Sequence, residues 1–270
     1  MTSPILIDNN NGVETVTLNR AEQMNAIDVD MAKALSEYFT QLASRKEVRV
    51  VILRSEGKHF SAGADLDSPA FVKDTEGRIH KQLDMQQLYS GIIRAMRYCP
   101  QPIICLIQGA AVGGGFSLTL GADVRIGCPN TRVSAAYLRI GLGGCDMGSG
   151  YLLPRLIGMA AASELLLTGN FMHAERALTT GLLSQVVELE SLLATGESLA
   201  EDMLKASPLG LRLTKETLNM SLNAGSFDAA LTMEDRQQVM LHETFDHTEA
   251  WMPLKKNEPL YLKTNKNQNK

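Results

Sequence analysis

The stretch QGAAVGGGFSLTLGADVRIG, residues 108–127, contains three consecutive glycines, Gly113–Gly115, and carries the strongest structural signal in the chain. The glycines stand between an apolar run, residues 102–109, and a short helical pattern whose first polar side chain is Ser117. The apolar run predicts a buried strand. A helix that begins at residues without side chains presents free N–H groups and the positive end of its dipole. The stretch therefore predicts a strand exit whose backbone can hold an anionic oxygen.

Neither of the common glycine-rich nucleotide motifs fits this stretch. Gly109 and the three later glycines do not supply the dinucleotide motif G-x-G-x-x-G. The lysine of a P-loop is absent, because Gly114 is followed by Gly115 and Phe116. Two interpretations stay open. The N–H groups hold an oxygen that becomes charged in a transition state, or the glycines only allow a helix to contact a strand closely.

A second loop of small residues, HFSAGADL at residues 59–66, follows another apolar run, residues 48–55. That run predicts a strand buried on both faces, and ligands of α/β folds bind at the carboxyl ends of such strands. Because Ala-Gly-Ala lacks bulky side chains, the N–H of Ala64 can reach a ligand. Together with the N–H of Gly114, it predicts a pair of backbone donors that form an oxyanion hole for a carbonyl oxygen.

The remaining pattern alternates strands with helices up to about residue 190 and contains only helices after it. It predicts an α/β core over residues 1–190 and a helical region over residues 191–270. The expected strands are a hairpin within the first twenty residues, the two apolar runs above, and residues 124–128, 132–136 and 184–187. The expected helices include residues 28–44, a stretch that ends near residue 96, and residues 190–206, 208–223 and 227–245.

The composition favours a small-molecule substrate. The chain has 270 residues, of which 44% are hydrophobic, and its 26 basic and 30 acidic residues are mixed along the chain. This charge provides no argument for nucleic acid or a membrane as a partner. The sequence shows no secretion signal and no apolar run of the roughly 18 residues that cross a bilayer, which predicts a cytoplasmic protein. Its four cysteines predict reduced thiols and no metal site, with Cys145 in a glycine-rich loop as the one to examine.

Five motifs in this order resemble the enoyl-CoA hydratase/isomerase (crotonase) superfamily, and the resemblance extends to about residue 259. The motifs are LNRAEQMNAI, GKHFSAGADL, QGAAVGGGFSLTLGADVRIG, LTGNFMHAERALTTGLLSQVV and ASPLGLRLTKETL. The resemblance implies a crotonase-like α/β spiral of repeated β-β-α units with a C-terminal helical trimerisation region. It also implies a homotrimer or a dimer of trimers, and an acyl-CoA thioester whose carbonyl oxygen is held by the N–H groups of Ala64 and Gly114.

The same resemblance implies where coenzyme A lies, as part of the substrate thioester and with no separate cofactor. Its adenine and pantetheine are expected along Met24, Ala62, Asp65 and Leu66. Its phosphates are expected near Arg20 and the C-terminal Lys255 and Lys256, which otherwise form a solvated basic cluster. Residues 68–97 are expected to line the acyl pocket, where the glutamines at 82, 86 and 87 face either the acyl group or solvent.

The chain departs from the hydratases of the superfamily at two positions. The resemblance places two water-activating glutamates at residues 117 and 137, where this chain has Ser117 and Tyr137. A serine or tyrosine hydroxyl is a poor general base near neutral pH. These residues are therefore expected only to line the active site, with Ser117 bonded back to its own helix.

Asp146, in GLGGCDMGSG, is the carboxylate expected to act instead. Dienoyl-CoA isomerases of the superfamily carry a catalytic aspartate in a similar loop, and one base suffices to move a proton on an enolisable thioester. The alternative is that Asp146 forms a turn or caps a helix near Ser149. The predicted function is an enoyl-CoA isomerase or atypical hydratase that acts through a stabilised thioester enolate. The alternatives are a catalytically altered acyl-CoA-binding protein and an acyl-CoA hydrolase or decarboxylase.

Overall fold

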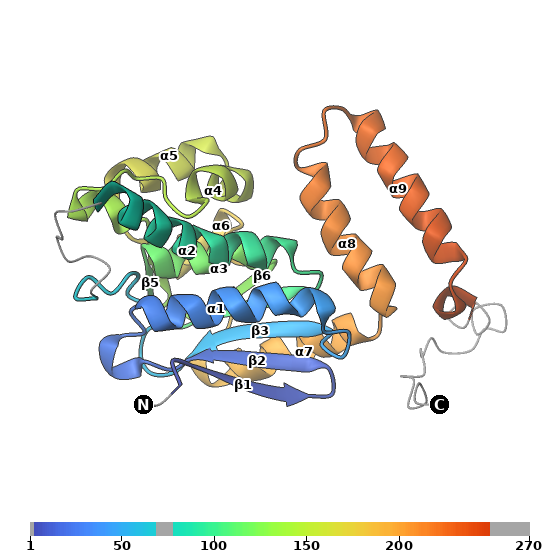
Figure 1. The fold of residues 1–270 in the computed structure, drawn as a ribbon, viewed down its shortest axis with the longest axis horizontal. Helices are drawn as coiled ribbons and strands as arrows, with labels where there is room; N and C mark the ends of the chain where they lie inside the picture. Colours follow the sequence, from blue (N-terminus) through green and yellow to red (C-terminus); the bar gives the residue numbers. More distant parts are fainter. Residues whose placement is uncertain (1–2, 69–77, 249–270) are drawn as a thin grey trace. The chain divides into compact units, whose positions relative to one another are not determined.

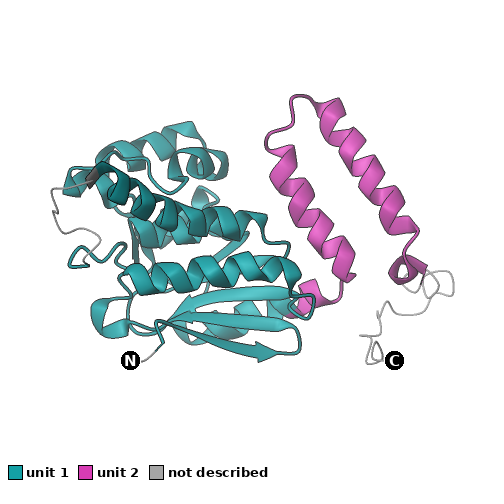
Figure 2. Ribbon diagram, in the orientation of Figure 1, with its two compact units in different colours: residues 1–200 teal, residues 201–270 magenta. Residues whose placement is uncertain are grey.

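The structure is a computed structural model that describes residues 3–68 and 78–248 (Figure 1). The chain forms two compact units, residues 1–200 and 201–270 (Figure 2). The sequence pattern predicted a core that ends at residue 190. The observed division falls within helix α7 (Leu192–Leu204), so the first of the C-terminal helices begins in the larger unit.

A six-stranded sheet forms the centre of the larger unit, in the order β1-β2-β3-β4-β6-β9. β1 and β2 form an antiparallel hairpin, and every later neighbour pairs in parallel. The strands are β1 (Ile5–Asn10), β2 (Val13–Leu18), β3 (Val50–Ser55), β4 (Ile103–Ile107), β6 (Val124–Gly127) and β9 (Gln185–Val186). A second sheet joins β5 (Ala110–Val112), β7 (Arg132–Ser134) and β8 (Met172–His173) in the order β5-β7-β8.

Helices cover the central sheet in a layer that Figure 1 shows above the strands. In it, α1 packs against α2, α2 against α3, and α3 against α4. The helices of this unit are α1 (Val29–Gln41), α2 (Arg78–Tyr98), α3 (Gly114–Gly121), α4 (Ser149–Ile157), α5 (Met159–Thr168) and α6 (Ala174–Thr179). α7 packs against β4, where a Cβ on Gly196 would lie 2.9 Å from Leu106. The strands β3 and β4 are thus buried as predicted.

The predicted helix over residues 28–44 is confirmed by α1. Asp28 Oδ1 accepts a hydrogen bond of 2.8 Å from the N–H of Met31, so Asp28 is the N-cap. The apolar residues at helical spacing are buried in the core: Met31, Leu35, Tyr38 and Phe39. Two short strands, β5 and β8, were not predicted. They have three and two residues, too few to show a periodic pattern, and pairing with β7 determines them.

The structure accounts for the three consecutive glycines in different ways. Gly113 has φ 50° and ψ −121°, a conformation that L side chains rarely adopt. A Cβ on Gly115 would lie 2.6 Å from the Cβ of Ser61, so glycine is needed there for α3 to approach the loop. Close packing therefore explains Gly115, whereas Gly114 begins α3 at the wall of a cavity.

The smaller unit contains the hairpin of α8 (Pro208–Ser221) and α9 (Phe227–His242), which pack against each other. Ser207 and Ser226 are the N-caps, with side chains that accept hydrogen bonds from Gly210 N–H at 3.0 Å and from Ala229 N–H at 3.1 Å. The predicted helices over residues 208–223 and 227–245 are confirmed, with ends a few residues shorter.

Candidate active site

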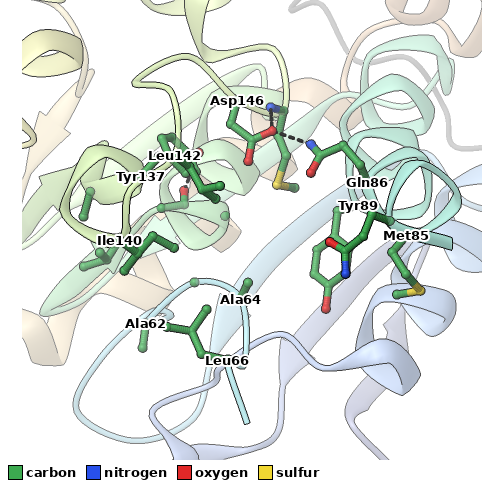
Figure 3. Close-up of a pocket in the computed structure, with 17 residues that line it drawn as sticks. Ala62, Ala64, Leu66, Met85, Gln86, Tyr89, Tyr137, Ile140, Leu142 and Asp146 are labelled. Carbon is green, nitrogen blue, oxygen red and sulfur yellow. Dashed lines mark hydrogen bonds between the residues drawn. The ribbon is translucent and has the colours of Figure 1, made fainter. Parts of the chain in front are cut away.

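A cavity of about 140 Å³ opens where the two small-residue loops meet (Figure 3). Its walls come from four segments of the larger unit: residues 62–66, the face of α2 at residues 82–89, residues 112–114, and residues 136–147. The first segment follows β3, and the third follows β4 after the short strand β5. Because β3 and β4 are parallel neighbours, the chain leaves both at the same edge of the central sheet. The cavity therefore lies where the sequence predicted a ligand.

The loop after β3 holds Ala64 at the cavity wall and next to Ile27. Ala64 forms a parallel bridge with Ile27, in which Ile27 N–H donates to Gly63 O at 2.7 Å and Asp65 N–H donates to Ile27 O at 2.9 Å. These two hydrogen bonds use the carbonyl oxygen of Gly63 and the N–H of Asp65, the residues before and after Ala64. Within the described residues the N–H of Ala64 itself donates to no protein acceptor.

The N–H of Gly114 lies beside that of Ala64. The Gly114 nitrogen is 3.3 Å from where a Cβ on Gly63 would stand, and the Ala64 nitrogen is 3.6 Å from where a Cβ on Gly114 would stand. As the first residue of α3, Gly114 has no acceptor one turn earlier in the helix. Gly63 makes this approach possible, since it has φ +95° and a Cβ there would lie 2.7 Å from Val112 O. The structure therefore brings the two predicted donors together.

The backbone of Asp146 forms a turn before α4. Its N–H donates to Ser149 Oγ at 3.0 Å, and its carbonyl oxygen accepts from Ser149 N–H at 2.9 Å. The N-cap residue of α4 is Gly148, and no side chain bonds to the first turn of that helix. The predicted turn is thus made by the backbone together with the Ser149 hydroxyl, and the Asp146 carboxylate does not cap α4.

The half-buried side chain of Asp146 lies on the cavity wall beside Gln86 of α2, across the cavity from the loop that contains Ala64 (Figure 3). Its Oδ1 accepts hydrogen bonds from Gln86 Nε2 at 2.5 Å and from Met147 N–H at 2.7 Å. Its Oδ2 accepts none from the described residues. Among the cavity-lining residues that the structure describes, Asp146 is the only one with an acidic side chain.

Tyr137 lines the cavity as predicted, whereas Ser117 is not among the lining residues. The two side chains meet, although twenty positions separate them in the sequence. Their hydroxyl oxygens are 2.5 Å apart, and Tyr137 Oη also donates to Gly113 O at 2.8 Å. Ser117 is fully buried and Tyr137 is 4% exposed. Burial raises the pKa of Tyr137 well above its ordinary value. The expected bond from the Ser117 hydroxyl back to its own helix is therefore not formed among the described residues; the hydroxyl pairs with Tyr137 instead.

The residues expected along coenzyme A occupy the outer side of the first loop. Ala62 N–H donates to Met24 O at 2.9 Å, which joins the two segments, and Ala62 and Leu66 line the cavity. Met24 and Leu66 are each 53% exposed, so their surfaces are open to a ligand. Asp65 Oδ2 instead pairs with Arg20 Nη2 at 3.0 Å.

Arg20 is already engaged by two carboxylates. Its guanidinium lies 3.0 Å from Asp65 and 3.2 Å from Asp28, and it also donates to Ala26 O. Reaching a phosphate would require it to leave or share these contacts. Lys255 and Lys256, the other expected phosphate contacts, lie outside the described residues.

α2 supplies cavity residues from the predicted acyl-pocket segment 68–97, of which residues 69–77 lie outside the described residues. Gln82 and Gln86 line the cavity, and Gln87 does not. Met85 and Tyr89, which were not predicted, lie on the same face, and Tyr89 Oη donates to Ile27 O at 2.9 Å. Burial raises the pKa of Tyr89 to about 12. The spacing of positions 82, 85, 86 and 89 is that of one helix face and was the available signal.

His59, Asp123 and Cys145 lie outside the cavity lining. His59 is half-buried, and its Nδ1 accepts from Ala110 N–H at 3.2 Å; burial lowers its pKa. Asp123 accepts from Ile103 N–H at 2.8 Å and pairs with Arg97 at 3.1 Å. The thiol of Cys145 is exposed, whereas the other three cysteines are buried.

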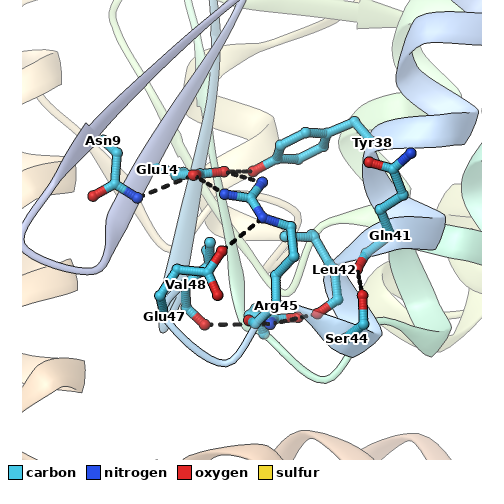
Figure 4. Close-up of polar contacts among 10 residues, drawn as sticks. Asn9, Glu14, Tyr38, Gln41, Leu42, Ser44, Arg45, Glu47 and Val48 are labelled. Atoms are coloured by element: carbon cyan, nitrogen blue, oxygen red, sulfur yellow. Dashed lines mark hydrogen bonds and ion pairs between the residues drawn. The ribbon is translucent and has the colours of Figure 1, made fainter. Parts of the chain in front are cut away.

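A second buried polar cluster lies away from the cavity, between the β1–β2 hairpin and α1 (Figure 4). Glu14, 2% exposed, accepts hydrogen bonds from Arg45 at 2.5 and 2.9 Å, from Asn9 at 3.0 Å and from Tyr38 at 2.9 Å. Burial raises the pKa of Glu14, but these donors together outweigh burial, and its pKa is below the ordinary value. This cluster is structural, because none of its members lines the cavity.

The sequence matches the profile of the enoyl-CoA hydratase/isomerase family over residues 8–261. The chain belongs to the enoyl-CoA hydratase/isomerase family. It is 37% identical to a protein of Mycobacterium tuberculosis named a probable enoyl-CoA hydratase, over 85% of this chain and 81% of that protein. It is 33% identical to the 1,2-epoxyphenylacetyl-CoA isomerase of Escherichia coli, over 88% of this chain and 90% of the isomerase. The crystal structure of an enoyl-CoA hydratase from Bacillus anthracis matches with a TM-score of 0.87 and 29% identity, over 96% of this chain and 98% of that chain.

These matches confirm the predicted crotonase-like α/β fold of the enoyl-CoA hydratase/isomerase family. They also confirm the predicted function at the level of an acyl-CoA-processing enzyme of the hydratase/isomerase type. None of the helices in the described ranges is long and apolar enough to cross a membrane. The same ranges contain no group of three or more His, Cys, Asp and Glu side chains placed to hold a metal ion.

Proposed function

We propose that this protein is an enoyl-CoA isomerase in which Asp146 moves a proton between carbon atoms of the acyl chain. The observation that carries the proposal is the Asp146 carboxylate. One of its oxygens is fixed by Gln86 and Met147, the other accepts no hydrogen bond from the described residues, and Asp146 lines the cavity. A carboxylate held in this way is oriented and still able to accept a proton.

The thioester carbonyl oxygen of the substrate binds between the N–H groups of Ala64 and Gly114. Both groups lie at the cavity wall and are near each other. When a proton leaves the α-carbon, negative charge develops on this oxygen, and the two donors stabilise the resulting enolate. Each donor of this kind lowers the barrier by about 2.7–4 kcal/mol. The dipole of α3 adds to the Gly114 side, because its positive end faces the same oxygen.

Asp146 acts as base and then as acid in this proposal. Its carboxylate removes the α-proton from a 3-enoyl thioester, the electron pair moves into the enolate, and the protonated Asp146 returns the proton at the γ-carbon. The product is the conjugated 2-enoyl thioester, and the carboxylate is regenerated. A single carboxylate suffices because the reaction neither adds nor loses a proton.

Hydration is the less supported reaction. By the resemblance to hydratases, residues 117 and 137 would carry the water-activating carboxylates, but here Ser117 and Tyr137 bond to each other. Tyr137 is buried, and its raised pKa makes its phenolate inaccessible near neutral pH. An atypical hydratase would therefore have to activate water with Asp146 alone.

The proposal has three further parts. Coenzyme A binds along Met24, Ala62, Asp65 and Leu66, the protein assembles as a homotrimer or a dimer of trimers, and its location is cytoplasmic. The exposed surfaces of Met24 and Leu66 beside the cavity support the first part. Exposed apolar side chains on the helical hairpin support assembly, among them Leu218, Phe227 and Val239. Size-exclusion chromatography with light scattering measures the assembly directly.

The test of the proposal is incubation of the purified protein with 3-hexenoyl-CoA in deuterated water. The proposal predicts 2-hexenoyl-CoA, identified by its absorption and mass, with deuterium at carbons that exchange through the enolate. A 3-hydroxyacyl product from 2-hexenoyl-CoA would indicate hydration instead. Release of free coenzyme A would indicate hydrolysis, and loss of carbon dioxide from a malonyl-type thioester would indicate decarboxylation. Tight binding of all these thioesters without turnover would support the alternative of an acyl-CoA-binding protein.

A further inference from the structure

The hydroxyl of Tyr137 contacts the same peptide group that carries the N–H of Gly114. We infer that Tyr137, backed by Ser117, is a positioning residue that aims and polarises this N–H toward the thioester oxygen. The inference rests on the proposed function, because it assigns a role through the Gly114 donor. It gives these two positions a function that differs from water activation.

The geometry of the peptide group supports this role. The carbonyl oxygen of Gly113 accepts hydrogen bonds from Tyr137 Oη at 2.8 Å and from Ser117 N–H at 2.9 Å. The carbonyl of Gly113 and the N–H of Gly114 belong to one planar trans peptide group and point in opposite directions. Two donors that fix the oxygen at one end therefore fix the direction of the N–H at the other end, toward the cavity.

The two hydroxyls form a directed chain of hydrogen bonds. Tyr137 has one proton, which it donates to Gly113 O, so Ser117 donates its own proton to Tyr137 Oη over 2.5 Å. The alternative acceptor for Ser117, the main-chain oxygen of Asp146, is farther away at 3.3 Å. Each bond in such a chain polarises the next, so the chain strengthens the Gly114 N–H as a donor.

Burial keeps the chain in this arrangement. Ser117 is fully buried and Tyr137 is 4% exposed, so water does not compete for either hydroxyl. The ring of Tyr137 also packs against Gly113, where a Cβ would lie 3.6 Å from the ring edge.

The test compares Tyr137→Phe with the wild-type protein in two measurements. The first is the absorption shift of bound 2,4-hexadienoyl-CoA, whose conjugated thioester absorbs at longer wavelength when its carbonyl oxygen accepts strong hydrogen bonds. The second is turnover of 3-hexenoyl-CoA. If cooperativity supplies about 10–30% of one oxyanion bond, kcat should fall about two- to eightfold, with the absorption shift reduced and KM changed less.

Tyr38→Phe is the matched control. Tyr38 is also a buried tyrosine, 5% exposed, and its hydroxyl donates to Glu14 at 2.9 Å, away from the cavity. This variant should lose a comparable amount of stability in urea unfolding while its absorption shift and kcat stay at the wild-type values. A purely structural role of Tyr137 would make the two variants behave alike.

The outcomes separate the inference from the proposed function. A wild-type absorption shift that Tyr137→Phe leaves unchanged, together with unchanged kcat, would overturn the inference alone. Absence of any shift and turnover in the wild-type protein would contradict the proposed oxyanion hole and the inference with it. If Tyr137→Phe does not fold, the Ser117→Ala variant provides the test. It removes the hydroxyl that donates to Tyr137 and should reduce the absorption shift by a smaller amount than the loss of Tyr137 Oη would. An unchanged absorption shift would refute the chain of hydrogen bonds.

Discussion

Replacement of Asp146 by asparagine should remove the chemistry and leave the cavity almost intact. The amide oxygen of the introduced side chain can still accept from Gln86 and from the N–H of Met147, as Oδ1 does in the wild-type protein. The amide nitrogen then takes the place of Oδ2, the oxygen that accepts no hydrogen bond from the described residues, and cannot accept a proton. The predicted defect is therefore in proton transfer and not in binding.

The expected loss in kcat is about 10²–10⁴-fold, the contribution of a positioned general base. This corresponds to about 2.7–5.5 kcal/mol of barrier height. The assay is the conversion of 3-hexenoyl-CoA followed by absorption, with the dissociation constant of 2-hexenoyl-CoA measured by calorimetry and expected to change little. Asp84→Asn is the matched control, because Asp84 is an exposed carboxylate on α2 outside the cavity lining. Asp146→Asn turnover within about threefold of the wild-type rate would refute the role of Asp146 as a general base.

Three further predictions concern the supports of the site and of the fold. Gln86→Leu removes the side-chain donor to Asp146, so kcat should fall about tenfold, as expected for a hydrogen bond to a charged group; unchanged steady-state kinetics would show that Met147 alone orients the carboxylate. Gly63→Ala places a Cβ 2.7 Å from a carbonyl oxygen of β5 at φ +95° and should lower the free energy of unfolding by about 1–3 kcal/mol, measured in urea; an equally stable variant would contradict the strain. Glu14→Gln should lower the free energy of unfolding by about 2 kcal/mol at pH 7. The expected loss is not larger because the Arg45 side chain is 30% exposed, so that solvent screens its ion pair with Glu14. Since the pKa of Glu14 is lowered in the folded protein, its ionised carboxylate stabilises the fold at pH values above the ordinary pKa of 4.5, and this stabilisation is lost as the pH falls through the pKa of the folded state. The difference in unfolding free energy between wild type and variant should therefore shrink in acid. A difference that stays constant with pH would disprove this.

The main donors of the site could be predicted because they follow from strand order and local sequence. Residues 48–55 and 102–109 predicted two buried strands, and these became the parallel neighbours β3 and β4. Small residues after neighbouring parallel strands must lie at one edge of the sheet, which brings Ala64 near Gly114. The resemblance then supplied the thioester oxygen as the ligand for these donors.

The contacts between distant segments could not be predicted in the same way. Gln86 and Asp146 are sixty positions apart, and neither the helical pattern of α2 nor the glycine-rich loop indicates which residue meets which. Ser117 and Tyr137 were predicted to share the active site, but a hydrogen bond between their hydroxyls depends on side-chain conformations that no local pattern encodes. The three-residue strand β5 depends likewise on its partner β7.

The most direct test of the oxyanion hole and its base is a crystal structure of the Asp146→Asn variant with 3-hexenoyl-CoA bound. The thioester oxygen is expected about 2.7–3.1 Å from the nitrogen atoms of both Ala64 and Gly114. The introduced amide at position 146 is expected to face the α-carbon of the acyl chain. A thioester oxygen held by other groups, or an acyl chain that lies outside the cavity between α2 and the two loops, would refute both roles.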